Sequence, residues 1–283
     1  MRAVTGTDWN YEDQDEWGDY CNTGIRQSPL DFDEVSLTSY GDFQFWNYRL
    51  INTTLEIKDH HLEVKLVPLS QERPHILGGG LVGKYVLDSF HIHGGTESGE
   101  GSEHRLLGCS FTGEIHFVHY KDTYGSVEEA REHEDGVAVL AVWLTAATGD
   151  NDEAFSLLED GGDDKESEKF HAASTAYWLL ELIPKGPFVP HSPGRTSLRH
   201  ILPSNDNNFY RYWGSLTTPP CSPTVVWTVF RDPVNVPARL INFLRSLNLG
   251  ENFRDIQGQD ERIVYFSGHP GRHVDECDDG DDK

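Results

Sequence analysis

The sequence predicts a mainly β (α+β) fold, in which strands supply most of one domain and helices are few and short. Two observations lead to this prediction. Alternating or continuous apolar runs, each bounded by Gly, Pro or Asn, recur along the 283 residues and have the length of strands. Hydrophobic residues make up 37% of the chain and aromatic residues 11%, so the chain can build a core despite its high charge.

Five of these runs are predicted to be strands, in chain order at His60–Pro68, Gly83–Gly94, Phe111–Tyr120, Val137–Ala146 and Thr224–Phe230. The first contains the alternating pattern HLEVKLVP and the fourth is the apolar run VAVLAVWLTA; both patterns are typical of strands. Two helices are expected. Ser167–Leu182 opens on a serine of capping type and ends before a proline, and Val236–Leu247 has a proline near its start, where the missing N–H costs nothing.

The chain contains no long linker and no repeated motif, which indicates a single strand-dominated domain over residues 8–266. Residues 267–283 end in DECDDGDDK and are expected to form a solvated acidic tail. Two other acidic clusters lie at Asp8–Asp19 and in a Gly-interrupted insertion at Asp150–Glu168.

The net charge of −24 narrows the possible partners. So acidic a surface repels phosphates and anionic lipids, which excludes nucleic acid as a partner. It suits high salt, where screening weakens self-repulsion, although an ordinary acidic protein with acidic tails would have the same composition. The sequence has no transmembrane segment and no secretory signal in Met1–Asp15, so we expect either a cytosolic protein or a mature domain whose leader has been removed.

A zinc site is predicted from three histidines on two successive strands. His91 and His93 alternate with apolar residues, so both rings face the same side of their strand. His116 lies on the next strand, and Glu114, two positions earlier on the same face, is placed to accept the second ring N–H of His116. Three neutral imidazoles with an open fourth position make a catalytic Zn²⁺ site. His119 points to the opposite face and is interpreted as a structural histidine.

A cupin jelly roll is the alternative interpretation of this pattern. His91-Ile-His93 followed by Glu97 is similar to the cupin H-x-H-x3-E motif, which binds iron, manganese or zinc. The flanking glycines do not have the cupin spacing, and the second cupin motif is absent from the sequence.

Six motifs in order resemble those of the alpha-class carbonic anhydrases, over almost the whole chain from Trp9 to about Tyr265. They are RQSP at Arg26–Pro29, SFHIHG, GSEH at Gly101–His104, GEIHFVHY, YWGSLTTPP at Tyr212–Pro220 and ENFRDIQ at Glu251–Gln257. The resemblance implies a large twisted, mostly antiparallel sheet with short peripheral helices, and reversible zinc-dependent hydration of carbon dioxide. It also implies inhibition by sulfonamides and anions. A member of the family that binds without catalysing is the alternative, but the residues below argue for an enzyme.

The same resemblance assigns roles to individual residues. His91, His93 and His116 are the zinc ligands, with Glu114, Ser89 and Asn252 behind them. Thr217 accepts a hydrogen bond from the attacking oxygen and donates its own proton to Glu103. The wall of the carbon dioxide pocket is implied to consist of Val118, Val139, Leu216, Val225 and Trp227, with Thr218 beside it. Ser89 departs from the family, many of whose members have a glutamine there, and serine is too short to make the same contact with His91.

The proton released by hydration needs an acceptor that titrates near neutral pH, which favours histidine. The resemblance places this group at His60, because the spacing from His60 to Val64 is that of the family, with Tyr11 in the chain of solvent that leads to it. His61 is the alternative, since a shortened loop precedes both histidines.

Cys21 and Cys221 correspond to the disulfide of the family's extracellular members. The resemblance therefore implies an extracellular or cell-surface protein, similar to the acidic, secreted enzymes of salt-tolerant algae. It also implies cis peptide bonds at Ser28–Pro29 and Pro219–Pro220.

Overall fold

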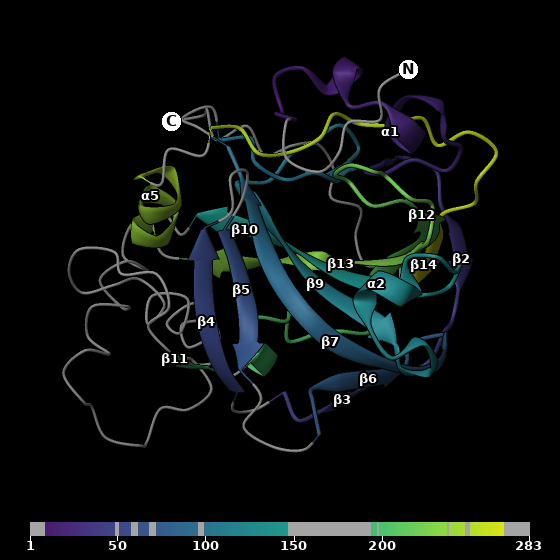
Figure 1. The fold of residues 1–283 in the computed structure, drawn as a ribbon, viewed down its shortest axis with the longest axis vertical. Coiled ribbons are helices and arrows are strands. Elements are labelled where there is room, and N and C mark those ends of the chain that lie inside the picture. The colour runs from purple at the N-terminus through teal and green to yellow at the C-terminus, as the bar shows by residue number, and fades with distance from the viewer. Residues whose placement is uncertain are drawn as a thin grey trace.

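One large curled sheet organises the fold (Figure 1). The computed structural model describes residues 9–48, 51–57, 62–67, 72–95, 99–146, 194–196, 198–236, 238–246 and 250–268. The strands follow the order β11-β4-β5-β7-β9-β10-β13-β12-β14-β2, and β3 and β6 pair with each other beside β7. Their bounds are β2 Ser36–Thr38, β3 Phe43–Trp46, β4 Ile51–Ile57, β5 Leu62–Val67, β6 His75–Gly78, β7 Leu81–Gly94, β9 Gly113–Lys121, β10 Val137–Ala146, β11 Gly194–Thr196, β12 Phe209–Gly214, β13 Val225–Val236 and β14 Tyr265–Ser267.

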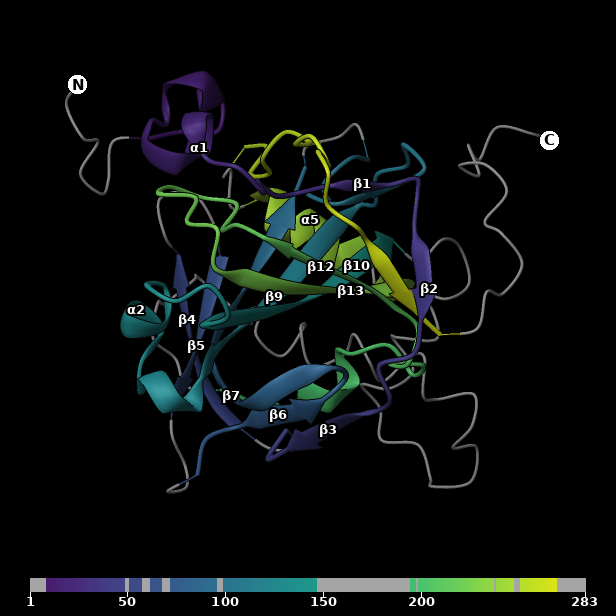
Figure 2. The same ribbon diagram turned by 90° about the vertical axis from the view of Figure 1, so that its right-hand side faces the viewer.

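Most neighbouring strands run antiparallel, as expected. Within the described residues the parallel pairs are β10 with β13, β14 with β2, and the separate pair of β1 (Asp31–Phe32) with β8 (Arg105–Leu106). Figure 2 shows β12 and β13 crossing the middle of the view, β14 (yellow) beside β2 at one side, and β3 and β6 at the lower end. The prediction of a mainly β fold with a large curled sheet is confirmed.

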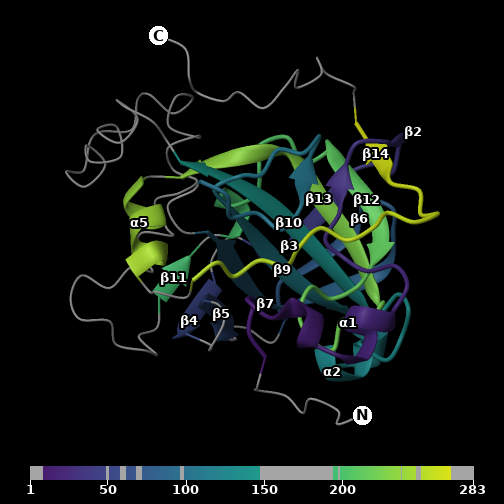
Figure 3. The same cartoon turned by 90° about the horizontal axis from the view of Figure 1, so that it is seen from above.

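The helices are short and lie at the periphery of the sheet (Figure 3). Within the described residues they are the 3-10 helices η1 (Gln14–Glu16), η2 (Asp122–Tyr124) and η4 (Leu198–His200), together with α1 (Asp19–Thr23), α2 (Val127–Ala130) and α5 (Ala238–Ser246). Helix α5 confirms the prediction at Val236–Leu247, whereas the one at Ser167–Leu182 lies outside the described residues. None of the helices in the described part of the chain is long and apolar enough to cross a membrane.

All five predicted strands are present, as β5, β7, β9, β10 and β13, and β13 continues six residues beyond the prediction, to Val236. The strands that the sequence did not predict are short or carry polar side chains. In β12, for example, the buried Arg211 interrupts the apolar pattern; its guanidinium donates to Thr228 Oγ1 and to the Gly79 carbonyl, both at 2.8 Å. A buried, hydrogen-bonded arginine has no local sequence signature.

The central strands are buried on both faces, because an apolar layer lies on each side of the sheet. Alternate residues of β10 belong to different layers. The first layer contains Ala138, Leu140, Val142 and Leu144, together with Phe90 and Phe117. The second layer contains Val137, Val139, Ala141 and Trp143, together with Trp227. Continuous apolar runs in β9 and β10 follow from this double burial.

A β-bulge in β7 decides which side chains face the second layer. The β7–β9 register shifts between Leu87 and Ser89. Before the bulge, odd-numbered residues such as Leu87 face the first layer; after it, even-numbered residues such as Phe90 do so. The bulge therefore turns His91 and His93 toward the opposite face, where residue 116 of the next strand also points.

Candidate metal centre

Three histidines from two neighbouring strands bring their rings together near the middle of the sheet. His91 lies directly opposite His116 in the antiparallel β7–β9 pair, and His93 is two residues further along β7. The centroids of the three rings are 4.5 to 5.2 Å apart. One nitrogen from each ring lies within 4.8 Å of the other two, a spacing that allows all three to bind the same ion.

Hydrogen bonds set the orientation of the two buried rings. His93 Nδ1–H donates to the main-chain oxygen of Asn252, and His116 Nε2–H donates to Glu114 Oε1, each at 2.6 Å. The opposite nitrogens, His93 Nε2 and His116 Nδ1, lie 3.5 and 3.7 Å from Glu103 Oε2 and so face the same point. His91 is partly exposed, so the group of three opens toward solvent on its side.

Asn252 is itself fixed to the end of β7. Its Oδ1 accepts a hydrogen bond from the Gly94 N–H at 2.6 Å, and its Nδ2 donates to the Ile92 carbonyl at 3.2 Å. The acceptor of His93 is therefore held by the same strand that carries His93.

The Glu114 carboxylate binds a second histidine. Its Oε1 accepts from His104 Nδ1–H at 2.7 Å, and its Oε2 accepts from the His104 main-chain N–H at 2.9 Å. His104 Nε2 lies 2.7 Å from the Tyr212 hydroxyl, which donates to Ser28 Oγ at 2.9 Å. His104, Glu114 and His116 are also close enough to bind an ion, but the hydrogen bonds among them already use those atoms. The sequence analysis gave no role to His104 or Tyr212; the only signals were their places in the GSEH and YWGSLTTPP motifs.

The surroundings lower the pKa of both Glu114 and His116. Burial alone would raise the pKa of Glu114, but the charges and hydrogen bonds of His104 and His116 outweigh it and hold that pKa well below its usual range. Burial, followed by the charge of His93, lowers the pKa of His116. His116 is therefore neutral at pH 7, which is the form that binds a metal.

Glu103 and Thr217, predicted as partners, are both buried and hydrogen-bonded to each other. Glu103 Oε1 also accepts from the Arg254 main-chain N–H at 2.9 Å. Burial raises the pKa of Glu103, and the charge of His116 and the hydrogen bond from Thr217 act in the opposite direction. The carboxylate lies beside two of the three histidines, and Thr217 lies next to it.

The residues predicted to form an apolar wall belong to one cluster. Val139 is paired with Val118 on one side and with Trp227 on the other, so these three residues form a row across β9, β10 and β13. Val225 is buried in the same cluster, and Leu216 packs against it while remaining partly exposed. Thr218 is also partly exposed.

Three further predicted residues have different outcomes. The Tyr11 ring packs against both Trp9 and Trp17, which also contact each other, and burial and the charge of Glu103 raise the pKa of Tyr11 well above its ordinary value. Ser89 is buried and its hydroxyl bonds to Asp88. His60 and His61 lie outside the described residues.

The expected disulfide is present between Cys21 and Cys221, with the two Cα atoms 4.9 Å apart. The peptide bonds Ser28–Pro29 and Pro219–Pro220 are both cis. These predictions from the resemblance are confirmed.

Three imidazoles and a buried carboxylate that meet on one face of a curled sheet are typical of metal-dependent enzymes. The model of the eukaryotic-type carbonic anhydrase family matches residues 12–268. The chain therefore belongs to this family and is a carbonic anhydrase, and the cupin alternative is wrong.

Curated relatives agree with this assignment. The chain is 32% identical to human carbonic anhydrase 12 over 291 residues, covering 93% of this chain and 74% of that protein. It is 30% identical to rabbit (Oryctolagus cuniculus) carbonic anhydrase 4, covering 96% of this chain and 89% of the relative. A putative carbonic anhydrase 5 of Caenorhabditis elegans is 29% identical, with 91% and 81% covered.

Proposed function

We propose that the chain catalyses the reversible reaction of carbon dioxide with water to give bicarbonate and a proton, using a zinc ion held by His91, His93 and His116. The observation that carries this proposal is the convergence of three imidazole nitrogens within 4.8 Å, with the rings of His93 and His116 held by acceptors on their other side. This donor set fits Zn²⁺, which takes three protein nitrogens in catalytic sites. When bound, zinc lowers the pKa of water to about 7, and carbonic anhydrases are the standard example of this effect.

Thr217 and Glu103 orient the attacking oxygen. A hydroxyl group has one proton, and Thr217 donates it to the Glu103 carboxylate. Thr217 Oγ is then able only to accept a hydrogen bond from the nucleophile. The nucleophile must therefore donate its own proton in a hydrogen bond to Thr217, which orients its lone pair toward the carbon of carbon dioxide.

The apolar cluster supplies a place for the substrate. Carbon dioxide has no net dipole, and the row of Val118, Val139 and Trp227 presents hydrocarbon and aromatic surface on the face of the histidines. Leu216 and Val225 extend this surface, and Thr218 borders it.

The test of the metal site is zinc content measured together with hydration of carbon dioxide. We expect one zinc per chain, and we expect His93→Ala and His116→Ala to lose most of it, because two of three ligands do not hold the ion. An aromatic sulfonamide should bind the wild type beside Thr217 and should not bind the variants. Full zinc occupancy in both variants would contradict the ligand assignment.

His60 is proposed to export the proton, with Tyr11 in the path. His60→Ala should lower kcat at high carbon dioxide and leave kcat/KM nearly unchanged, since only proton transfer is removed. Imidazole buffer should restore the rate. If His61→Ala shows this behaviour instead, the shuttle is His61.

An extracellular location and tolerance of high salt complete the proposal. The disulfide supports the first, because disulfides persist in oxidising compartments. The net charge of −24 supports the second, because a dense carboxylate surface repels itself less when salt screens it. Detection of the mature protein outside the cell by antibody, without permeabilisation, tests the location.

A further inference from the structure

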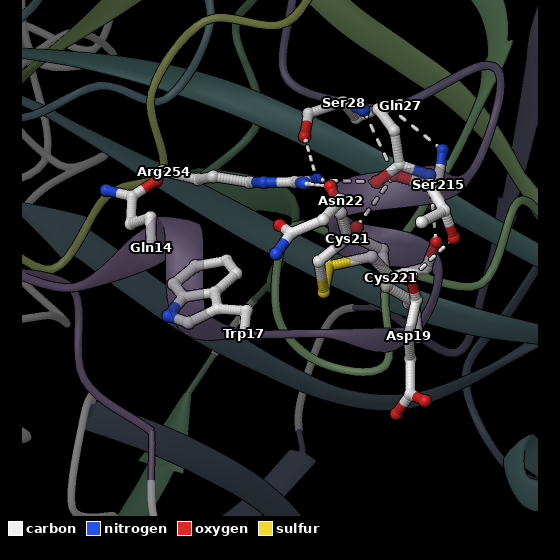
Figure 4. Close-up of a disulfide and its surroundings, with 12 residues drawn as sticks. Gln14, Trp17, Asp19, Cys21, Asn22, Gln27, Ser28, Ser215, Cys221 and Arg254 are labelled. Carbon is white, nitrogen blue, oxygen red and sulfur yellow. Dashed lines mark hydrogen bonds between the residues drawn. A yellow bond between two sulfur atoms is a disulfide. The ribbon is translucent and has the colours of Figure 1, made fainter. Parts of the chain in front are cut away.

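Arg254 is a buried arginine whose main chain and side chain bond to different parts of the molecule. Its N–H donates to Glu103 Oε1 at 2.9 Å. Its guanidinium donates to the Gln27 side chain at 2.9 Å and to the carbonyls of Ser28 and Cys21, both at 2.8 Å. It also lies 5.5 Å from the centroid of Trp17. Figure 4 shows the guanidinium reaching the disulfide segment.

Residues on both sides of Arg254 are held by the same N-terminal segment. Gln14 Nε2 donates to the Phe253 carbonyl at 3.3 Å, and Gln14 Oε1 accepts from the Asp255 N–H at 2.9 Å. The segment 253–255 is therefore fixed on either side of the one amide that points at Glu103.

The disulfide continues this path to the threonine. Cys21 accepts from Arg254 and is bonded to Cys221, and the Cys221 N–H donates to the Thr218 carbonyl at 2.9 Å. Gln27 provides a second route, since its Nε2 donates to the Cys221 carbonyl at 3.2 Å. Because Thr217 bonds to Glu103, the contacts form a closed ring that holds both members of that pair.

We propose that Arg254 is a positioning residue for the hydration step. Its side chain fixes its own amide, and that amide sets where the Glu103 carboxylate lies relative to Thr217. Among the described residues the guanidinium donates no hydrogen bond to Glu103, and although its charge acts on that carboxylate, the only hydrogen bond from Arg254 to Glu103 is the one from its main-chain N–H. The inference rests on the proposed roles of Glu103 and Thr217.

The test compares Arg254→Met with Arg211→Met. Both arginines are buried, and burial lowers the pKa of each to about 10, but Arg211 bonds to Thr228 and Gly79, away from the histidines. We expect both variants to be less stable. Arg254→Met should keep one zinc per chain and lose ten- to a hundredfold in kcat/KM, about what a displacement near 1 Å costs. Arg211→Met should stay within about twofold of the wild type.

A double-mutant cycle with Glu103→Gln separates positioning from general destabilisation. If Arg254 acts through Glu103, Arg254→Met should cost less than about twofold in kcat/KM once Glu103 is Gln. In zinc-free protein, hydrogen exchange of the peptide spanning 251–258 should be faster in Arg254→Met and unchanged in Arg211→Met. Arg254→Lys keeps the charge and some of the hydrogen bonds, so it should recover part of the activity that Arg254→Met loses. If Arg254→Met does not fold, Arg254→Lys is used in its place.

Wild-type kcat/KM in Arg254→Met, or in Arg254→Lys when it stands in, would overturn the inference. An equal loss in the Glu103→Gln background would do the same. Glu103→Gln with wild-type kcat/KM would instead contradict the proposed role of Glu103, so failure of the proposed function is distinguished from failure of this inference.

Discussion

His116 and His119 lie three positions apart on one strand, and their different roles follow from the face of the sheet to which each side chain points. His116 faces the other histidines, whereas His119 faces the first apolar layer, as the alternation of the strand predicted. His119 Nδ1–H donates to the Phe117 carbonyl at 2.9 Å, and the Tyr48 hydroxyl bonds to its Nε2. Both nitrogens of this neutral ring are satisfied, so its interpretation as a structural histidine is confirmed.

We predict that His119 makes the protein less stable in acid. Burial lowers the pKa of His119 from 6.5 to about 3, despite hydrogen bonds to two carbonyls that act in the opposite direction. The unfolded chain therefore takes up a proton near pH 6.5 that the native protein rejects until about pH 3. The free energy of unfolding should fall through this window by about 1.4 kcal/mol per pH unit. His119→Gln should remove that slope in urea denaturation of the zinc-free protein, and parallel pH curves for the two proteins would refute it.

At the scale of elements, the N-terminal segment has little regular structure, but it makes several of the long-range contacts near the site. Helix α1 contributes Cys21, and the 3-10 helix η1 contributes Gln14, to contacts with segments more than 190 residues away. Trp17 is buried against the disulfide, with Tyr11 and Trp9 packed around it. Short helices at the periphery therefore act as anchors for the loops beside Glu103 and Thr217.

We predict that replacing both cysteines, Cys21→Ser with Cys221→Ser, lowers the free energy of unfolding by up to about 5 kcal/mol. The bond closes a loop with a sequence separation of 200, and the chain-entropy model gives this value for a loop of that length. The kcat/KM should fall as well, because the ring that holds Glu103 and Thr217 is opened. Denaturant titration and initial rates measure the two effects. Equal stability of the variant and the oxidised wild type would show that the link carries no such energy.

At the scale of the whole molecule, charge is the unusual property. The chain has 47 acidic and 23 basic residues, while its sheet is an ordinary, doubly buried apolar structure. Core packing does not change with ionic strength, but repulsion among surface carboxylates does. Salt should therefore change the free energy of unfolding through the repulsion among surface carboxylates and not through the packing of the core.

We predict that Tm rises by a few degrees between 0.01 M and 1 M NaCl. The Debye length shrinks over this range from about 30 Å to about 3 Å, which removes most of the repulsion among like charges. Scanning calorimetry in NaCl and in KCl checks this prediction, and the two salts should agree if screening is the cause. Activity has an opposing term, since chloride competes at the metal and screening weakens the field that repels it. A Tm that decreases with salt would end the proposal of halotolerance.

The sequence by itself determined the strands with clear periodicity, the family and, through the motifs of that family, the histidine set and the disulfide pair. These features are local: alternation in β7 and β9 needs only neighbouring residues, and the motifs are contiguous. The same local rules failed for β12, where Arg211 is buried, and they gave no role to His104, Tyr212 or Arg254.

Only the tertiary structure decided how these parts meet. The bulge between Leu87 and Ser89 sets the face of the two β7 histidines through one register shift, which strand periodicity does not contain. The bonds from Tyr212 to His104 and from Arg254 to Glu103 join residues 108 and 151 positions apart. Buried polar groups take whatever partner the packed chain brings within about 3 Å, because leaving them unpaired costs more than any local preference. That partner is a property of the fold, not of the neighbouring sequence.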